Sequence, residues 1–257
     1  MASKQTTHQA IEAYHRVAKE DRPLYERWIG NISMASLLGD MKDAADGFLH
    51  NASFILKFEK PELSERRVQD HQQDLFDAII DPYYAVQFYR YAIEGVPYFV
   101  SRPNKSWSEG WTDREGAELQ YLDFGAQIDA FVAYNEFFGS PAESGAKPGR
   151  AFSLVVILNT LAARANLDLF RLTGEDGVLS IHDIALLAQM QETSVRNYAG
   201  PRSQDRLETE KDGRATRVRC SVAEPWLKRR RGYKETRLPQ SEAAKVAMTE
   251  ILRDFFA

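Results

Sequence analysis

The sequence predicts a mainly α fold, in which a helical N-terminal domain is followed by a small module and a C-terminal helix. Three observations predict it. Apolar residues recur at helical spacing over much of residues 1–175. An Asp-Gly pair at residues 212–213, a strong hairpin signal, lies between two segments with strand-like composition in residues 176–237. Residues 238–257 place their apolar side chains on one helical face.

Residues 1–175 form the predicted helical body, which we expect to set the oligomeric state or to bind a partner or an effector. Residues 151–172 are strongly apolar and too long for one strand, which predicts a buried helix. Residues 139–149 are rich in Gly, Ser, Pro and Ala and are the predicted linker. Aromatic residues are frequent in residues 83–138. They favour a packed core, with a ligand pocket or a subunit interface as the alternative.

The charge of the chain is unevenly distributed, although its net charge is only −4. Residues 196–237 contain 13 Lys and Arg against 6 Asp and Glu, whereas residues 1–195 contain 18 against 28. A single basic segment next to an acidic body indicates a module that binds a polyanion and is attached to a part with another role.

Several classes of protein are disfavoured by the composition. The single cysteine, Cys220, cannot form an internal disulfide, which fits a cytoplasmic location. The N-terminal residues are polar, unlike a secretory signal, and no uninterrupted apolar stretch reaches the ~18 residues of a membrane span. The histidines show no metal-binding spacing, and no glycine-rich phosphate motif occurs. We therefore expect no metal, no cofactor, no membrane association and no enzymatic activity.

Residues 181–200 carry the pattern on which the functional interpretation depends. Ser180 precedes them as a good N-cap, because its hydroxyl can accept a hydrogen bond from a free amide of the first helical turn. Two short helices that cross steeply need small and apolar residues where they touch, and these positions hold Ile184, Ala185, Ala188, Met190, Val195 and Tyr198. The residues around Val195 are polar, so a second helix at 192–199 would present a polar face outwards.

This pattern resembles the helix-turn-helix of DNA-binding proteins. It departs from the family at Gln189, where glycine is most common at the turn, so a helical hairpin without a sharp turn is an alternative. An ordinary pair of amphipathic helices in a helical protein is another.

The residues that follow extend the resemblance. Segments 206–210 and 214–220 are predicted strands joined by Lys211-Asp212-Gly213, and a short helix at 221–229 brings Trp226 and Leu227 into the packing. A surface ribbon without a partner is the alternative for the hairpin. The order of helix, turn, helix, hairpin and helix resembles the winged helix-turn-helix of the MerR and excisionase group.

The resemblance implies a sequence-specific transcriptional regulator of bacterial type that binds double-stranded DNA. Helix 192–199 would read the major groove, and the wing and the basic run 228–231 would contact phosphates, although such a run is commonly a solvated face. The expected DNA-binding residues are Thr193, Ser194, Arg196, Asn197, Arg202, Arg214, Arg217, Arg219, Lys228, Arg229, Arg230 and Arg231. The alternatives are a helical scaffold or small-molecule-binding protein whose basic module contacts RNA or protein, and an accessory factor for phage or plasmid excision or partition.

The C-terminal segment predicts an amphipathic helix that begins near Glu242 and is capped by Ser241. Its apolar face gathers Ala244, Met248, Ile251, Leu252, Phe255 and Phe256. A face of this size needs cover. We expect the cover to come from a second subunit of a homo-oligomer, with docking on the same chain as the alternative.

Overall fold

The computed structural model describes residues 25–41, 82–97, 152–213 and 215–256. These residues are mostly helical and include one small antiparallel sheet, which confirms the predicted mainly α class. The predicted linker at 139–149, the helical segments expected between residues 42 and 81, most of the aromatic-rich region and Arg214 lie outside the described residues.

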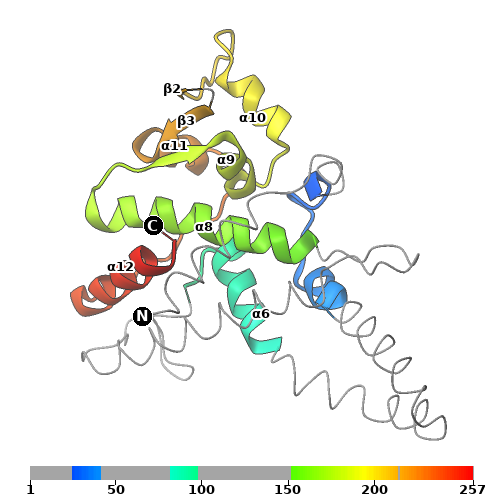
Figure 1. The fold of residues 1–257 in the computed structure, drawn as a ribbon, viewed down its shortest axis with the longest axis vertical. Coiled ribbons are helices and arrows are strands. Elements are labelled where there is room, and N and C mark those ends of the chain that lie inside the picture. The colour runs from blue at the N-terminus through cyan, green and yellow to red at the C-terminus, as the bar shows by residue number, and fades with distance from the viewer. Residues whose placement is uncertain (1–24, 42–81, 98–151, 214, 257) are drawn as a thin grey trace, which may run out of the picture.

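Helix α8 (Phe152–Thr173) runs through the middle of the described structure (Figure 1). Leu154, Ile157, Leu158 and Leu161 are almost completely buried, as predicted for this apolar segment. Residues 153–173 are long and apolar enough to cross a membrane, but 78% of that window is buried inside the protein. We therefore interpret α8 as a core helix, because other elements of the same chain surround it.

A compact set of elements follows α8 along the chain. In order, it consists of strand β1 (Val178–Ser180), helices α9 (Ile181–Ala188) and α10 (Glu192–Ala199), strands β2 (Glu210–Asp212) and β3 (Ala215–Arg219), and helix α11 (Cys220–Lys228). The strands form an antiparallel sheet in the order β1-β3-β2, with Leu179 opposite Val218. The sequence analysis missed β1, because three residues are too few to show an alternating pattern.

The β2–β3 hairpin exists but is placed differently from the prediction. Lys211 pairs with Thr216 and Asp212 with Ala215, so these two residues belong to strand β2 and not to the turn that was predicted at 211–213. Gly213 has a φ of 56°, as tight hairpin turns require. The first strand does not include residues 206–209. The amide of Leu207 donates to the Tyr198 carbonyl at 2.9 Å and its side chain is buried, so this segment is bound to α10.

One hydrophobic core unites α8 with the elements after it. It contains residues from α8, β1, α9, α10, β3 and α11, among them Leu167, Leu179, Ile184, Val195, Val218 and Trp226. Helix α8, which the sequence analysis placed in the N-terminal body, therefore stabilises the small module directly.

Two segments from the N-terminal part also pack on α8. Tyr25 and Ile29 form a small cluster with Val156 of α8 and Leu186 of α9. Helix α6 (Pro82–Tyr89) continues as the π-helical segment η2 (Arg90–Glu94), which ends at Gly95. The carbonyl of Gly95 accepts a hydrogen bond from the Arg237 amide at 2.9 Å, and this bond fastens the chain after α11 to the N-terminal part.

Helix α12 (Glu242–Phe256) ends the chain and lies against α8 (Figure 1). The amide of Ala244 donates to Ser241 Oγ at 3.3 Å, which agrees with the predicted cap. Ala244, Met248, Ile251 and Leu252 are buried within the same chain. The structure therefore covers this part of the face without a second subunit, contrary to our expectation, and the side chains of Phe255 and Phe256 lie outside the described residues.

Candidate nucleic-acid interface

Helix α9 begins with a capping box and ends in a sharp turn. The Asp183 amide donates to Ser180 Oγ at 3.0 Å, and the Ser180 amide donates to Asp183 Oδ2 at 2.7 Å. At the other end Gln189 adopts a left-handed conformation, with φ 53° and ψ 46°. The Met190 amide then donates to the Ala185 carbonyl at 2.9 Å. The turn expected between the two helices is present, and the alternative hairpin without a sharp turn is excluded.

The structure explains how the turn forms with Gln189 in the usual place of glycine. A left-handed conformation costs an L-residue about 1–2 kcal/mol, so the surroundings must hold it. Gly30 and Gly232 approach the turn closely. A Cβ atom on Gly30 would lie 2.5 Å from the Gln189 carbonyl oxygen, and one on Gly232 would overlap the Ala188 carbonyl. The two segments that enclose the turn thus have glycine, which has no Cβ atom, at the positions closest to it.

Helix α10 is anchored through Val195 and exposes its opposite face. Val195 is completely buried, and Met190 and Tyr198 pack against the same core, as predicted. Thr193, Arg196 and Asn197 are exposed, and Ser194 is half-buried. Figure 1 shows α10 and the hairpin at the same end of the molecule, at the end away from α6 and α12. These exposed side chains are therefore accessible to a large partner.

Arg196 is exposed but has a carboxylate partner. Its Nε donates to Glu192 Oε1 at 3.1 Å, and its Nη2 also contacts this oxygen. His182 of α9 lies behind the carboxylate, with Nδ1 3.4 Å from Glu192 Oε2. The hydrogen bond with His182 and the Arg196 guanidinium together hold the pKa of Glu192 at about 2, so the carboxylate is charged at neutral pH.

The basic run 228–231 does not form one free surface. Lys228 Nζ lies 2.9 Å from Glu224 Oε1 and 3.0 Å from Glu235 Oε1. Arg229 Nη2 lies 2.8 Å from Asp205 Oδ1. Arg231 is exposed and makes no ion pair with the residues that the structure describes.

Arg230 differs most from its predicted role as a phosphate contact. Only 12% of its side chain is exposed, and its guanidinium forms an ion pair with Asp205. The guanidinium carbon lies 3.8 Å from the centre of the Trp226 ring and 4.5 Å from that of Tyr198, which is cation–π geometry. Arg230 therefore belongs to the packing between α10, α11 and the loop 200–209, and we remove it from the candidate interface.

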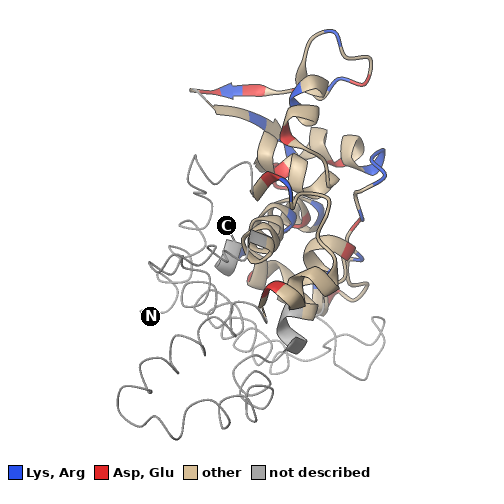
Figure 2. Ribbon diagram, turned by 90° about the vertical axis from the view of Figure 1, so that its right-hand side faces the viewer, with Lys and Arg blue, Asp and Glu red and all other residues tan. Residues whose placement is uncertain are grey.

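The cations of the wing are also interspersed with carboxylates (Figure 2). Arg219 Nε lies 3.0 Å from Glu210 Oε1 across the hairpin, and Arg217 Nε lies 3.8 Å from Asp212 Oδ2. In the loop after α10, Arg202 is exposed without an ion pair to any described residue. Arg206, which the sequence analysis did not select, has the same environment in that loop.

The sequence analysis overlooked the acidic partners of these cations. Glu192 and Arg196 are four residues apart on a helix, a spacing that predicts an ion pair and could have been used. The hairpin register pairs Glu210 with Arg217, and the Glu210 side chain reaches Arg219 two residues further along β3; the shifted strand prediction obscured this proximity. Asp205 reaches Arg229 and Arg230 from a loop, and no local pattern predicts such a contact.

Neither a metal centre nor a reactive thiol is found among the described residues. They contain no group of three or more His, Cys, Asp and Glu side chains that could hold a metal ion. Burial raises the pKa of the Cys220 thiol to about 12, so this group is not a nucleophile at neutral pH.

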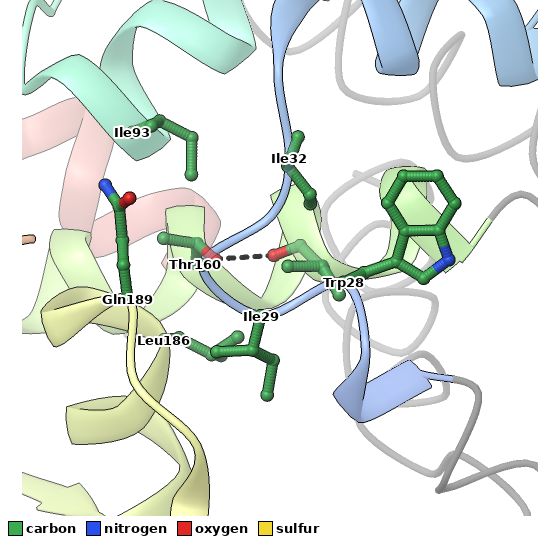
Figure 3. Close-up of a pocket in the computed structure, with 9 residues that line it drawn as sticks. Trp28, Ile29, Ile32, Ile93, Thr160, Leu186 and Gln189 are labelled. Carbon is green, nitrogen blue, oxygen red and sulfur yellow. Dashed lines mark hydrogen bonds between the residues drawn. The ribbon is translucent and has the colours of Figure 1, made fainter.

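A small pocket lies between the N-terminal residues and the α9–α10 turn (Figure 3). Trp28, Ile29, Ile32, Thr160 and Leu186 line it, together with Gln189. Its volume of about 10 Å³ is enough for one water molecule at most. The Thr160 hydroxyl donates its proton to the Val156 carbonyl at 2.6 Å, so this proton is not available to a ligand. The pocket is therefore too small to bind a substrate or an effector.

In comparisons with protein-family models, with curated proteins and with solved structures, no match to this chain was found.

Proposed function

We propose that this chain is a sequence-specific regulator that binds double-stranded DNA through a winged helix-turn-helix formed by β1 to α11. The connectivity supports this proposal. A sharp turn separates α9 and α10, a hairpin follows them, and its strand β3 pairs with β1, which precedes both helices. In this arrangement the second helix would enter the major groove and the hairpin would lie against the sugar-phosphate backbone.

The outward face of α10 is the observation that carries the proposal. Val195 is the single fully buried residue of this helix, and Thr193, Arg196 and Asn197 are exposed together. Arginine can donate two hydrogen bonds to guanine, asparagine can pair with adenine in the same bidentate way, and threonine can contact various bases. A helix that exposes these three side chains, and that is anchored in the core by one apolar residue, is suited to contacting base edges.

Phosphate contacts are assigned first to three exposed arginines that make no ion pair with a described residue and lie next to α10 or α11 in the chain. These are Arg202 and Arg206 in the loop after α10, and Arg231 after α11. Arg217, Arg219, Lys228 and Arg229 remain in the proposed interface as weaker contributors, because each must share or leave a carboxylate to bind phosphate. Arg214 lies outside the described residues and stays in the proposal from the sequence alone.

The proposal also includes a cytoplasmic homo-oligomer without a catalytic role. One helix-turn-helix reads only a few base pairs, so DNA-binding proteins of this kind commonly pair two half-sites through an oligomer. The N-terminal part is a suitable source of the contact or of effector control. It contacts the proposed helix-turn-helix directly, since Gln191 Nε2, next to α10, donates to the Glu26 carbonyl at 3.0 Å.

The decisive experiment uses the full chain to select duplexes from a random double-stranded library. The affinity for the enriched duplex and for a scrambled duplex of equal composition is then measured over a salt series. We expect a preference of at least about a thousandfold for the enriched duplex, and a linear fall of log K with log salt. Equal affinity for both duplexes, or no binding at low salt, would refute the proposal.

A second candidate is a module that contacts another protein. It is favoured by the carboxylates Glu192, Asp205 and Glu210, which offset several cations of the face. A protein partner of this kind would bind with a weak dependence on salt and without preference for any duplex, so the same salt series distinguishes the two candidates.

A further inference from the structure

A line of polar side chains extends from the protein interior to the exposed arginine of α10. Asn159 Nδ2 of α8 donates to the Tyr25 hydroxyl at 2.8 Å, and that hydroxyl lies 2.9 Å from His182 Nε2. His182 Nδ1 faces Glu192, and Glu192 receives the Arg196 guanidinium. Tyr25 at one end is 2% exposed as a residue, the side chains of His182 and Glu192 are 28% and 15% exposed, and that of Arg196 is 59% exposed.

The hydrogen bonds of this line are compatible with one consistent placement of protons. The Tyr25 oxygen accepts from Asn159 and lies 2.9 Å from His182 Nε2, a distance at which the Tyr25 hydroxyl can donate to that nitrogen. An imidazole that accepts at Nε2 carries its proton on Nδ1 and can donate it to the Glu192 carboxylate. Each group thereby orients the next one, and the carboxylate that faces Arg196 is fixed from behind by α8, α9 and the N-terminal segment.

The geometry of the guanidinium determines which of its donors remain free. Arginine presents its N–H groups in a rigid planar fork with more than one donor edge. Glu192 Oε1 occupies the edge formed by Nε and Nη2. The edge formed by Nη1 and the outer hydrogen of Nη2 makes no hydrogen bond with the described residues. Bidentate pairing with the O6 and N7 atoms of guanine needs an edge of this kind.

We infer that Glu192, backed by His182, is a positioning residue that holds Arg196 with its free edge towards a guanine in the major groove. This inference rests on the proposed function and adds a specificity determinant to it. Fixing the guanidinium before binding reduces the conformational entropy that the contact must overcome, so it strengthens binding to the correct base in particular.

The opposite interpretation makes the opposite prediction. If Glu192 withheld Arg196 from DNA, removing its charge would release the arginine and strengthen binding to every duplex. If Glu192 positions Arg196, removing its charge weakens the contact with guanine, while the loss of a negative charge from the face leaves other DNA binding equal or stronger. The two interpretations are therefore distinguished by the sign of one change.

The test compares Glu192→Gln with Glu208→Gln in the full chain. Glu208 is exposed on the segment before β2 and makes no ion pair with the described residues, so its variant removes the same charge without touching Arg196. Dissociation constants are measured for the duplex that the wild-type chain enriches and for its scrambled counterpart. We expect Glu192→Gln to lower the ratio of the two affinities about tenfold, the size of one good bidentate contact, and Glu208→Gln to leave the ratio unchanged.

A double-mutant cycle separates positioning from a general structural effect. In an Arg196→Ala background, Glu192→Gln should no longer alter the affinity ratio, because the residue that it positions is absent. His182→Ala should lower the ratio in the same direction, with thermal unfolding recorded to show that each variant is folded. Glu192→Gln that strengthens binding to the enriched duplex as much as to the scrambled one would overturn the inference. A wild-type chain without any duplex preference would instead overturn the proposed function.

Discussion

The face of α10 and the run 228–231 are both basic in sequence, yet the structure uses their arginines in different ways. Arg196 is directed outwards with one supporting carboxylate, whereas Arg230 packs on two adjacent aromatic rings and contacts Asp205. The difference shows that a count of charges along a segment does not describe a surface. Carboxylates from other elements decide which cations stay accessible, and Asp205 is one of these although it lies 25 residues from Arg230.

The largest expected effect tests the structural role of Arg230. Arg230→Ala should lower the free energy of unfolding by about 3 kcal/mol, because it removes a mostly buried ion pair and a cation–π contact. Equilibrium denaturation measures this change. Arg231→Ala is the matched control, since its exposed side chain makes no ion pair with the described residues and should alter stability by less than about 0.5 kcal/mol. Equal stability of the two variants would show that Arg230 contributes no more to the stability of the fold than the exposed Arg231.

The next effect concerns DNA specificity and sharpens the other side of the comparison. Arg196→Ala should weaken binding to the enriched duplex by about 1–3 kcal/mol and bind the scrambled duplex much as before, because base contacts carry the preference. Arg202→Ala is the counterpart. It should weaken both duplexes to a similar extent and reduce the slope of log K against log salt by about 1. An identical pattern for the two arginines would reassign Arg196 to phosphate binding.

A smaller effect is expected at the turn that directs α10. Gln189→Gly should raise the free energy of unfolding by about 1 kcal/mol, because glycine adopts the left-handed conformation without steric cost. Gln189→Val should instead destabilise the protein, since a β-branched side chain tolerates this conformation poorly. Thermal unfolding of both variants checks the prediction. A destabilised glycine variant would mean that the Gln189 side chain supports the fold by more than its backbone strain costs.

The smallest effect is a pH dependence that originates on α10. The folded-state pKa of Glu192, about 2, lies below its ordinary value of 4.5. The ion pairs of Glu192 therefore stabilise the fold above about pH 4.5, and this contribution is lost as the pH falls towards 2. The difference in unfolding free energy between wild type and Glu192→Gln should shrink by less than about 1 kcal/mol between pH 5.5 and pH 3, because solvent screens a pair this near the surface. A difference that is constant over this interval would show that the carboxylate is not stabilised by its partners.

The sequence predicted the elements whose signals are local. Ser180 as a cap, Val195 as the buried residue of α10, Trp226 and Leu227 in the core, and the start of α12 at Glu242 each follow from residues within a turn or two of one another. The outward direction of Thr193, Arg196 and Asn197 followed from the same periodicity. Helical spacing therefore predicted the shape of the candidate site well.

Contacts between distant segments were not predictable in the same way. The burial of Arg230 depends on Asp205 and on two rings from different helices, and the cover of α12 is provided by α8, about eighty residues earlier in the chain. The short strand β1 became recognisable through its pairing with β3. In each case the deciding partner lies outside the window in which sequence periodicity can be read.

The close approach of Gly30 and Gly232 to the α9–α10 turn has a practical consequence for protein engineering. Residue 189 itself could be exchanged for many side chains at moderate cost. In contrast, a single added carbon at position 30 would press on the Gln189 carbonyl, and one at position 232 would press on that of Ala188. A mutational library aimed at new specificity can therefore vary the exposed positions of α10 freely, provided that these two distant glycines are left unaltered.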